Sequence, residues 1–192
     1  MGDYFTEEPG ILPNKLGVDD PELLKAIEVS VVMVRLIWLE ENPINGEIGF
    51  DHLCAIHRYS FSDLYHFAGV MRDVWLAKDD GVFCYPENLE GAQQAIFTQL
   101  KHDKLLKGLG KPEFIEKLAT LTGDLIALHP FREGNGRSVR AFLKQLAENA
   151  GYDLNYEDVR DDELLSTDIA TFKGNLAPLK ELLHRIVSPV AV

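Results

Sequence analysis

One short segment of the chain, residues 129–140 with the sequence HPFREGNGRSVR, concentrates side chains that could perform chemistry. It combines an imidazole, a carboxylate, a Gly-Asn-Gly triplet and guanidinium groups. It also lies at the junction of two segments whose apolar residues recur at helical spacing. This combination predicts a phosphate-binding loop with a metal ligand and a general base beside it.

The phosphate-binding part of this prediction rests on Gly134, Asn135 and Gly136. Glycines let successive backbone N–H groups turn inward, and the positive end of the following helix points at the same place. Arg137 and Arg140 are three residues apart, so they share a face of that helix and suit a di- or triphosphate. A Gly-Asn-Gly triplet alone is usually a simple turn, and paired arginines are usually solvated, so the combination carries the prediction.

Glu133 and His129 supply the remaining groups. Mg²⁺ takes one or two protein carboxylates and completes its shell with water and substrate phosphates, which suits a single glutamate beside a phosphate loop. A glutamate at a helix start also stabilises the helix dipole, and both roles stay open. A neutral imidazole accepts a proton from a hydroxyl, so His129 is a candidate base for attack of that hydroxyl on phosphorus. A lone histidine at a helix end is more often structural, and here its neighbours favour catalysis.

Apolar periodicity predicts that helices hold this segment in place. The expected helices cover residues 21–41, 50–65, 89–106, 113–128, from 136 or 137 to about 150, 157–165 and 176–187. Two short β-prone runs around an Asp-Gly pair predict one hairpin over residues 73–85. The predicted fold class is therefore mainly α, a helical bundle with one β-hairpin. Residues 1–20 are expected to form an N-terminal arm, residues 21–187 the domain and residues 188–192 a C-terminal tail.

Residues 129–140 match every defining position of HPFx(D/E)GNGRxxR, the motif of Fic-domain proteins, which the chain resembles. Residues 56–72 resemble the helix that precedes the family's flap, and residues 73–85 occupy the position of that flap. Residues 174–179 resemble the closing Gly-Asp-x-x-Pro segment, with Asn175 in place of the aspartate. The resemblance covers most of the chain and implies a helical Fic-type bundle.

The resemblance implies an enzyme that binds ATP with Mg²⁺ and transfers AMP to a Tyr, Thr or Ser hydroxyl of a target protein. It assigns the base to His129 and the Mg²⁺ ligand to Glu133. It assigns nucleotide binding to residues of the loop, the helix and the flap: Gly134, Asn135, Gly136, Arg137, Arg140, Lys78 and Asp79. Among these, Arg140 is expected to reach the γ-phosphate.

The resemblance also implies partners. The target protein is expected to dock on the flap hairpin 73–85 by edge pairing, and the adenine pocket to lie near residues 165–172. The family's inhibitory element, [S/T]xxxE(G/N), is missing from the sequence. The chain thereby resembles the subgroup that is controlled by a separate small antitoxin, which would supply a glutamate to Arg140. We therefore expect the toxin half of a bacterial toxin–antitoxin pair.

The amino-acid composition argues against some classes of binding partner. Asp and Glu number 31 and Lys and Arg 19, for a net charge of −12, and such a surface repels nucleic acid. No apolar run is long enough to span a membrane. Two separated cysteines form no disulfide framework, and the N-terminus lacks the pattern of a signal peptide. We expect a cytoplasmic protein with neither a nucleic-acid nor a membrane partner.

Two alternative functions remain at this stage. The first is a Fic-type transferase of another phosphate-containing group, although Gly136 argues against the kinase-like branch, which has a lysine there. The second is a nucleotide-binding interaction module without turnover, which the presence of His129, Glu133 and both helix arginines disfavours. A purely structural helical domain would leave the clustering of these groups without a reason.

Overall fold

The structure is a computed structural model that describes residues 11–78 and 81–190. Helices dominate these residues, and the strands are two or three residues long. In chain order the elements are α1 (Pro21–Glu41), α2 (Phe50–Phe61), β1 (Ala77–Lys78), β2 (Gly81–Val82), η1 (Pro86–Asn88), α3 (Leu89–His102), η2 (Lys104–Leu106), α4 (Lys111–Leu128), α5 (Asn135–Ala150), β3 (Tyr152–Leu154), α6 (Asp161–Phe172), α7 (Ala177–Ile186) and β4 (Val187–Pro189).

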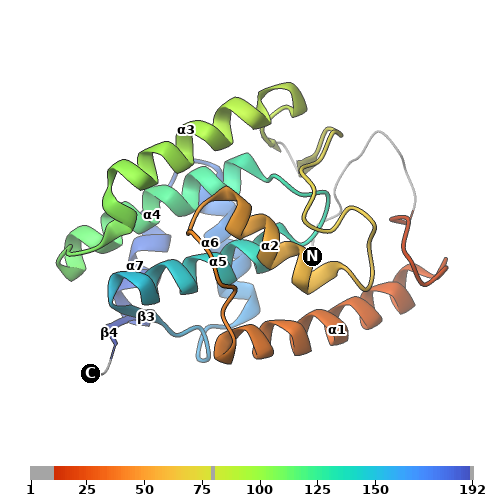
Figure 1. The fold of residues 1–192 in the computed structure, drawn as a ribbon, viewed down its shortest axis with the longest axis horizontal. Coiled ribbons are helices and arrows are strands. Elements are labelled where there is room, and N and C mark those ends of the chain that lie inside the picture. Colours follow the sequence, from red (N-terminus) through yellow and green to blue (C-terminus); the bar gives the residue numbers. More distant parts are fainter. Residues whose placement is uncertain (1–10, 79–80, 191–192) are drawn as a thin grey trace.

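The helices α4 and α5 form the centre of the bundle. Figure 1 shows α3 along one side of this pair and α1 along the opposite side. Helix α5 contacts α2, α4 and β3, and Phe114, Leu125 and Phe142 are completely buried between these elements. Burying a side chain of this size contributes about 1.5–3 kcal/mol. The core therefore extends along α4 and α5, the two helices that flank the loop of residues 129–134.

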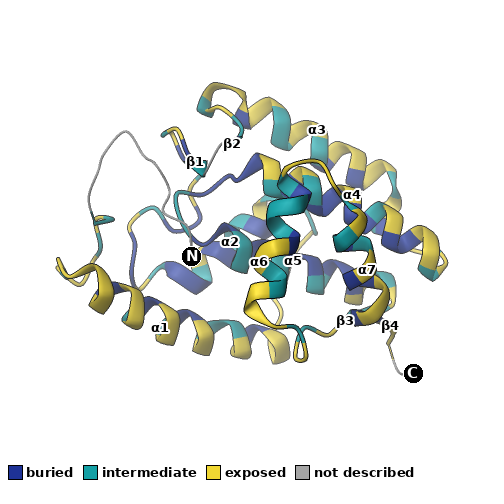
Figure 2. Ribbon diagram, turned by 180° about the vertical axis from the view of Figure 1, so that it is seen from behind, coloured by how far each residue is buried: buried dark blue, intermediate teal, exposed yellow. Residues whose placement is uncertain are grey.

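Helix α1 begins where the sequence predicts. The Asp20 side chain accepts hydrogen bonds from the amides of Glu22 and Leu23, at 2.9 and 3.0 Å, and Pro21 occupies the first turn. These features satisfy helix-start amides that would otherwise lack partners. The inner face of α1 is buried, whereas much of its outer face is exposed, including Val34 and Trp38, as Figure 2 shows.

The predicted hairpin is present, although it is short. Strands β1 and β2 pair antiparallel, with Ala77 opposite Val82 and Lys78 opposite Gly81. A second antiparallel pair, β3 with β4, was not predicted, because runs of three residues carry no periodicity. Strand β4 takes in residues 188–189, which were expected in the tail.

Three predicted helices differ in their bounds by more than two residues. The second helix was expected to reach residue 65, but it ends at Phe61. The third was expected over 89–106, but α3 ends at His102 and the separate short helix η2 covers Lys104–Leu106. Helix α6 was expected over 157–165, but it covers Asp161–Phe172, and its first turn carries three acidic residues. Acidic side chains favour the positive end of a helix, so this run was the signal for the true start.

Two expectations from composition can be compared with the structure. Within residues 11–78 and 81–190, no helix combines the length and apolar character that crossing a bilayer requires. Cys54 and Cys84 are both free thiols and half-buried.

Candidate active site

The loop between α4 and α5 is closed by its own side chains. His129 ends α4 in the left-handed region, with φ 45°. The Asn135 side chain accepts a hydrogen bond from the Phe131 amide at 2.8 Å and donates one to the Phe131 carbonyl at 2.7 Å. Phe131 itself is completely buried. The sequence predicts that Asn135 contacts phosphate, but its amide group closes the loop, which leaves its backbone N–H for that role.

Gly134 turns the chain into α5. Its φ is 76°, and a Cβ at this position would lie 2.2 Å from the Phe61 ring, so only glycine fits. The N-cap residue of α5 is Gly134, which has no side chain to cap the first amides of the helix. Since the first amides of a helix lack intrahelical partners, the helix start at Asn135 and Gly136 offers backbone N–H groups to an anion.

The imidazole of His129 is enclosed by the hairpin. The ring of Phe83, directly after β2, stacks on it with centroids 3.7 Å apart and an interplanar angle of 18°. Burial lowers the pKa of His129 to about 3, with a further lowering by the charge of Arg72, while a hydrogen bond to the backbone of Ile126 opposes the shift. The ring is therefore neutral at pH 7, the form that accepts a proton.

Arg72 joins the catalytic loop to both ends of the hairpin segment. It is 5% exposed and donates to the backbone carbonyls of His129 at 2.7 Å, Val74 at 2.6 Å and Cys84 at 2.5 Å. A weaker contact, at 3.4 Å, reaches the Leu128 carbonyl. One buried guanidinium thus fixes the peptide of the candidate base relative to the flap.

The His57 side chain packs against the loop between α4 and α5. Its ring lies between those of Phe61 and Phe131, with centroids at 4.6 and 3.9 Å. The Gly69 amide donates to Nδ1 at 2.7 Å, so Nε2 carries the proton and donates to the Glu133 carbonyl at 2.9 Å. Burial lowers the pKa of His57 to about 4. The ring is neutral and structural, since its nitrogens bind backbone groups.

The Glu133 side chain lies beside the helix start. Its Oε1 accepts from the Gly134 amide at 2.8 Å and from Arg137 at 3.3 Å. Burial raises the pKa of this carboxyl group, and the charge of Glu28 raises it further. In the described part of the chain, no three His, Cys, Asp or Glu side chains form a metal cluster. Any cation here would therefore share its shell with ligand and water oxygens, as Mg²⁺ does.

The two helix arginines point in different directions. The guanidinium of Arg137 lies 2.5 Å from Glu28 and 3.3 Å from Glu133. Arg140 lies 3.2 Å from Asp168 on α6. Their prediction as nucleotide ligands remains a prediction. The structure adds Glu28 and Asp168 as their partners.

A cavity of about 320 Å³ opens between the hairpin, the loop and α6. Lys78, His129 and Gly136 line it, together with an apolar wall from α6. That wall includes Leu165 and Phe172, within the segment expected to hold adenine. Asp79, also a predicted nucleotide ligand, lies outside the described residues.

Four residues of this site received no role from the sequence: Glu28, His57, Arg72 and Asp168. His57 and Arg72 were named only as part of residues 56–72, which resemble a family pattern. A polar side chain in an apolar stripe was the available signal, since such groups are buried only with partners. Their partners are distant in sequence and could not be read from it.

The model of the Fic/DOC family matches residues 47–147. These residues include α2, the hairpin, α3, α4 and most of α5, and so the whole loop described above. The chain belongs to the Fic/DOC family.

Two curated relatives of this Fic domain are named protein adenylyltransferases. This chain is 34% identical over 189 residues to protein adenylyltransferase VbhT of Bartonella schoenbuchensis. The match covers 98% of this chain and 40% of VbhT. The chain is 33% identical over 178 residues to the probable protein adenylyltransferase y4lH of Sinorhizobium fredii, and this match covers 92% of the chain and 91% of that protein. The chain therefore spans less than half of the first relative and nearly all of the second.

A solved structure is also similar to this Fic domain. BepC, a VirB-translocated effector of Bartonella tribocorum with bound AMPPNP, superposes with a TM-score of 0.86 at 25% identity, covering 97% of this chain and 96% of BepC. The predicted Fic-type helical fold with a hairpin flap is confirmed. The assignment to an enzyme family of protein adenylyltransferases is confirmed as well.

Proposed function

We propose that this Fic domain transfers AMP from ATP to a Tyr, Ser or Thr hydroxyl of a target protein. The observation that carries the proposal is the meeting of two features at one cavity. The His129 side chain and the start of α5 at Asn135 and Gly136 both line it. A proton acceptor and an anion-binding helix end thus face the same ligand space.

The reaction is a substitution at the α-phosphorus of ATP. The hydroxyl oxygen of the target bonds to that phosphorus, and its proton passes to the imidazole of His129. The bond from the α-phosphorus to the bridging oxygen breaks, and pyrophosphate leaves with the electron pair. The amides at the start of α5 stabilise the charge that develops on the phosphate oxygens.

The Glu133 carboxylate fits the Mg²⁺ that this chemistry uses. Its contacts with other described residues are made by Oε1, which leaves Oε2 to bind a cation. Glu133 would hold the Mg²⁺, and the Gly134 amide orients its carboxylate. The bound ion would supply positive charge beside the phosphates.

The residues in and around the cavity indicate the remaining contacts with the nucleotide. The apolar wall of Leu165, Ile169 and Phe172 suits a purine ring, and Lys78 from the hairpin lines the same space. Arg140, which now contacts Asp168, is positioned to exchange that carboxylate for the γ-phosphate. Arg137 is the other nucleotide ligand expected on α5, and its guanidinium contacts Glu28 and Glu133.

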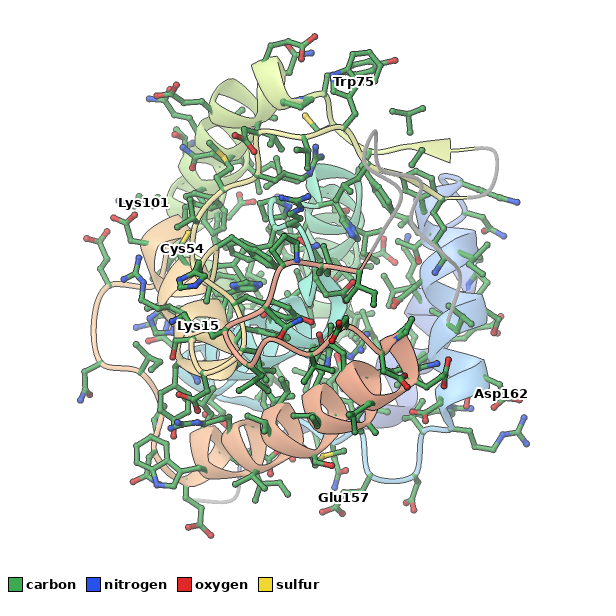
Figure 3. All side chains as sticks on the ribbon, turned by 90° about the vertical axis from the view of Figure 1, so that its right-hand side faces the viewer. Lys15, Cys54, Trp75, Lys101, Glu157 and Asp162 are labelled. Carbon is green, nitrogen blue, oxygen red and sulfur yellow. The ribbon has the colours of Figure 1, made fainter. Side chains whose placement is uncertain are left out.

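The target protein docks on the hairpin. Strands β1 and β2 form a two-stranded sheet, so each strand has an outer edge that can pair with an extended segment. Val82 is about half exposed on β2, and Trp75 is about half exposed on the segment leading into β1. Figure 3 shows Trp75 projecting at this surface.

A small antitoxin controls the enzyme by supplying a glutamate to Arg140 in trans. The sequence lacks the inhibitory element that would supply it in cis. The Arg140 side chain is 31% exposed, and a groove between α1 and α5 borders it. Co-expression with the neighbouring gene should restore growth of cells that this chain arrests, and growth arrest that persists would contradict this control.

Labelling of a bacterial lysate tests the proposed reaction. The purified protein, Mg²⁺ and radiolabelled ATP should label a target, and the mass added to that target should be AMP. His129→Ala should abolish the labelling and keep ATP binding. His102→Ala, at an exposed histidine of α3, is the matched control and should label normally. A different added mass would indicate transfer of another group, and ATP binding without labelling by the unmodified protein would indicate an interaction module.

A further inference from the structure

Glu28 is a buried carboxylate in the middle of α1, outside the residues that the family model matches. It is 6% exposed. Its Oε2 accepts a hydrogen bond from the Tyr65 hydroxyl, and its Oε1 accepts one from Arg137 at 2.5 Å. A charge is buried only when partners compensate it, so Glu28 occupies a site built to hold it.

Arg137 is shared unequally between two carboxylates. Its Nη2 lies 2.5 Å from Glu28 and 3.3 Å from Glu133. The guanidinium carbon lies 4.9 Å from the centre of the Phe61 ring, which limits its movement on that side. Glu28 is therefore the stronger partner and draws Arg137 away from Glu133.

The position of Arg137 affects the Glu133 carboxylate. Its Oε1 accepts from the Gly134 amide and receives the longer contact from Arg137. The charged groups at this point are the carboxylates of Glu28 and Glu133 and the guanidinium of Arg137. Their charges sum to a negative value, which favours an additional cation.

We propose that Glu28 is a positioning residue for the Mg²⁺–nucleotide site, which holds the Arg137 guanidinium off Glu133 and so leaves the Glu133 carboxylate for the cation. This inference rests on the proposed function, because it assumes that Glu133 binds Mg²⁺. Tyr65 assists by donating to Glu28. Without the charge of Glu28, Arg137 would pair with Glu133 and compete with the cation.

Glu28→Gln tests the inference, because it keeps the shape of the side chain and removes its charge. Calorimetry should measure Mg²⁺ binding to the protein saturated with AMPPNP. The expected result is a dissociation constant for Mg²⁺ roughly tenfold higher, the size of effect seen when a group that orients a metal ligand is removed. The Mg²⁺ concentration for half-maximal labelling of the target should rise by a similar factor.

Glu40→Gln is the matched control. Glu40 also lies on α1 and forms an ion pair with Lys144 of α5 at 2.9 Å. Its loss removes a contact between the same two helices at a place away from Glu133. Mg²⁺ binding and the Mg²⁺ dependence of labelling should stay as in the unmodified protein.

The outcomes separate positioning from a structural role. If Glu28→Gln lowers thermal stability and activity but leaves the dissociation constant for Mg²⁺ unchanged, Glu28 only joins α1 to the bundle and the inference is wrong. Tyr65→Phe, which removes the hydroxyl donor, gives a second measurement if Glu28→Gln does not fold, and should raise the constant by a smaller factor. If it leaves the constant unchanged, the inference is again wrong. If the unmodified protein binds AMPPNP without any dependence on Mg²⁺, the metal role of Glu133 in the proposed function fails, and this inference with it.

Discussion

The α4–α5 loop and the hairpin of β1 and β2 line the same cavity, yet they are held in different ways. The loop is fixed from inside by buried groups, namely the Asn135 amide, the His57 ring and the Arg72 guanidinium. The hairpin has strands of two residues each, and Val82 on it is about half exposed. In the proposed reaction, the loop is therefore the fixed centre that holds the candidate base, and the hairpin is the accessible edge on which the target would dock.

The α4–α5 loop and the hairpin are in contact where the hairpin joins the rest of the domain. Arg72 binds carbonyls on both sides of the hairpin as well as that of His129, and Phe83 stacks on the His129 ring. A target held at the hairpin edge is thereby held at a set place relative to the base. Positioning of this kind is a large part of catalysis, because a misplaced reacting group costs orders of magnitude in rate.

The largest expected effect is a loss of stability when Arg72, which connects the loop and the hairpin, is replaced. Arg72→Met leaves several buried carbonyls without their donor, so the free energy of unfolding should fall by about 3 kcal/mol or more. Urea denaturation measures this change. Arg185→Met, at an exposed arginine paired with exposed Glu163, is the control and should change stability by less than about 0.5 kcal/mol. Equal effects of the two variants would mean that Arg72 does not join loop and hairpin.

The free energy of unfolding should depend on pH through His57, which packs against the α4–α5 loop. The pKa of His57 is about 4 in the folded protein, against an ordinary value of 6.5. Between these values the unfolded chain binds a proton that the folded protein does not, so stability falls as the pH is lowered from 6.5 toward 4. From pH 7 to pH 4.5 this histidine alone should cost about 2–3 kcal/mol.

His57→Gln isolates that contribution. The variant should be less stable at pH 7, because the hydrogen bonds from Gly69 and to Glu133 are altered, but its stability should fall less steeply with acid. Urea denaturation at pH 7 and pH 4.5 compares the two slopes. An unchanged slope would show that the buried imidazole is not the group that titrates.

The smallest effect on stability is expected in the hairpin. Val82→Ser changes an exposed side chain, so the free energy of unfolding should move by no more than about 0.5 kcal/mol. The KM for the target protein should nevertheless rise several-fold, while the affinity for ATP stays the same. If KM for the target is unaffected, docking does not use this edge.

The sequence anticipated the helical class and the loop between two helices at residues 129–140, because both depend on local features. Helix α1 begins at the predicted residue, where Asp20 caps it and Pro21 occupies its first turn, and the loop was predicted from glycines next to a helix start. The bounds of α6 were missed because its apolar spacing is weak, and β3 and β4 were missed because their pairing joins residues 152–154 to residues 187–189. Partners so far apart leave no periodic signal in either segment.

What the sequence determined by itself is the set of candidate reactive groups, His129, Glu133 and the Gly-Asn-Gly triplet, and their order along one short segment of chain. Only the tertiary structure decided what holds each of them. It placed Glu28 against Arg137, Asp168 against Arg140 and Arg72 against the His129 carbonyl. The physical reason is that spacing along a helix defines which side chains share a face, whereas the partner of a buried charge is chosen by packing between helices distant in sequence.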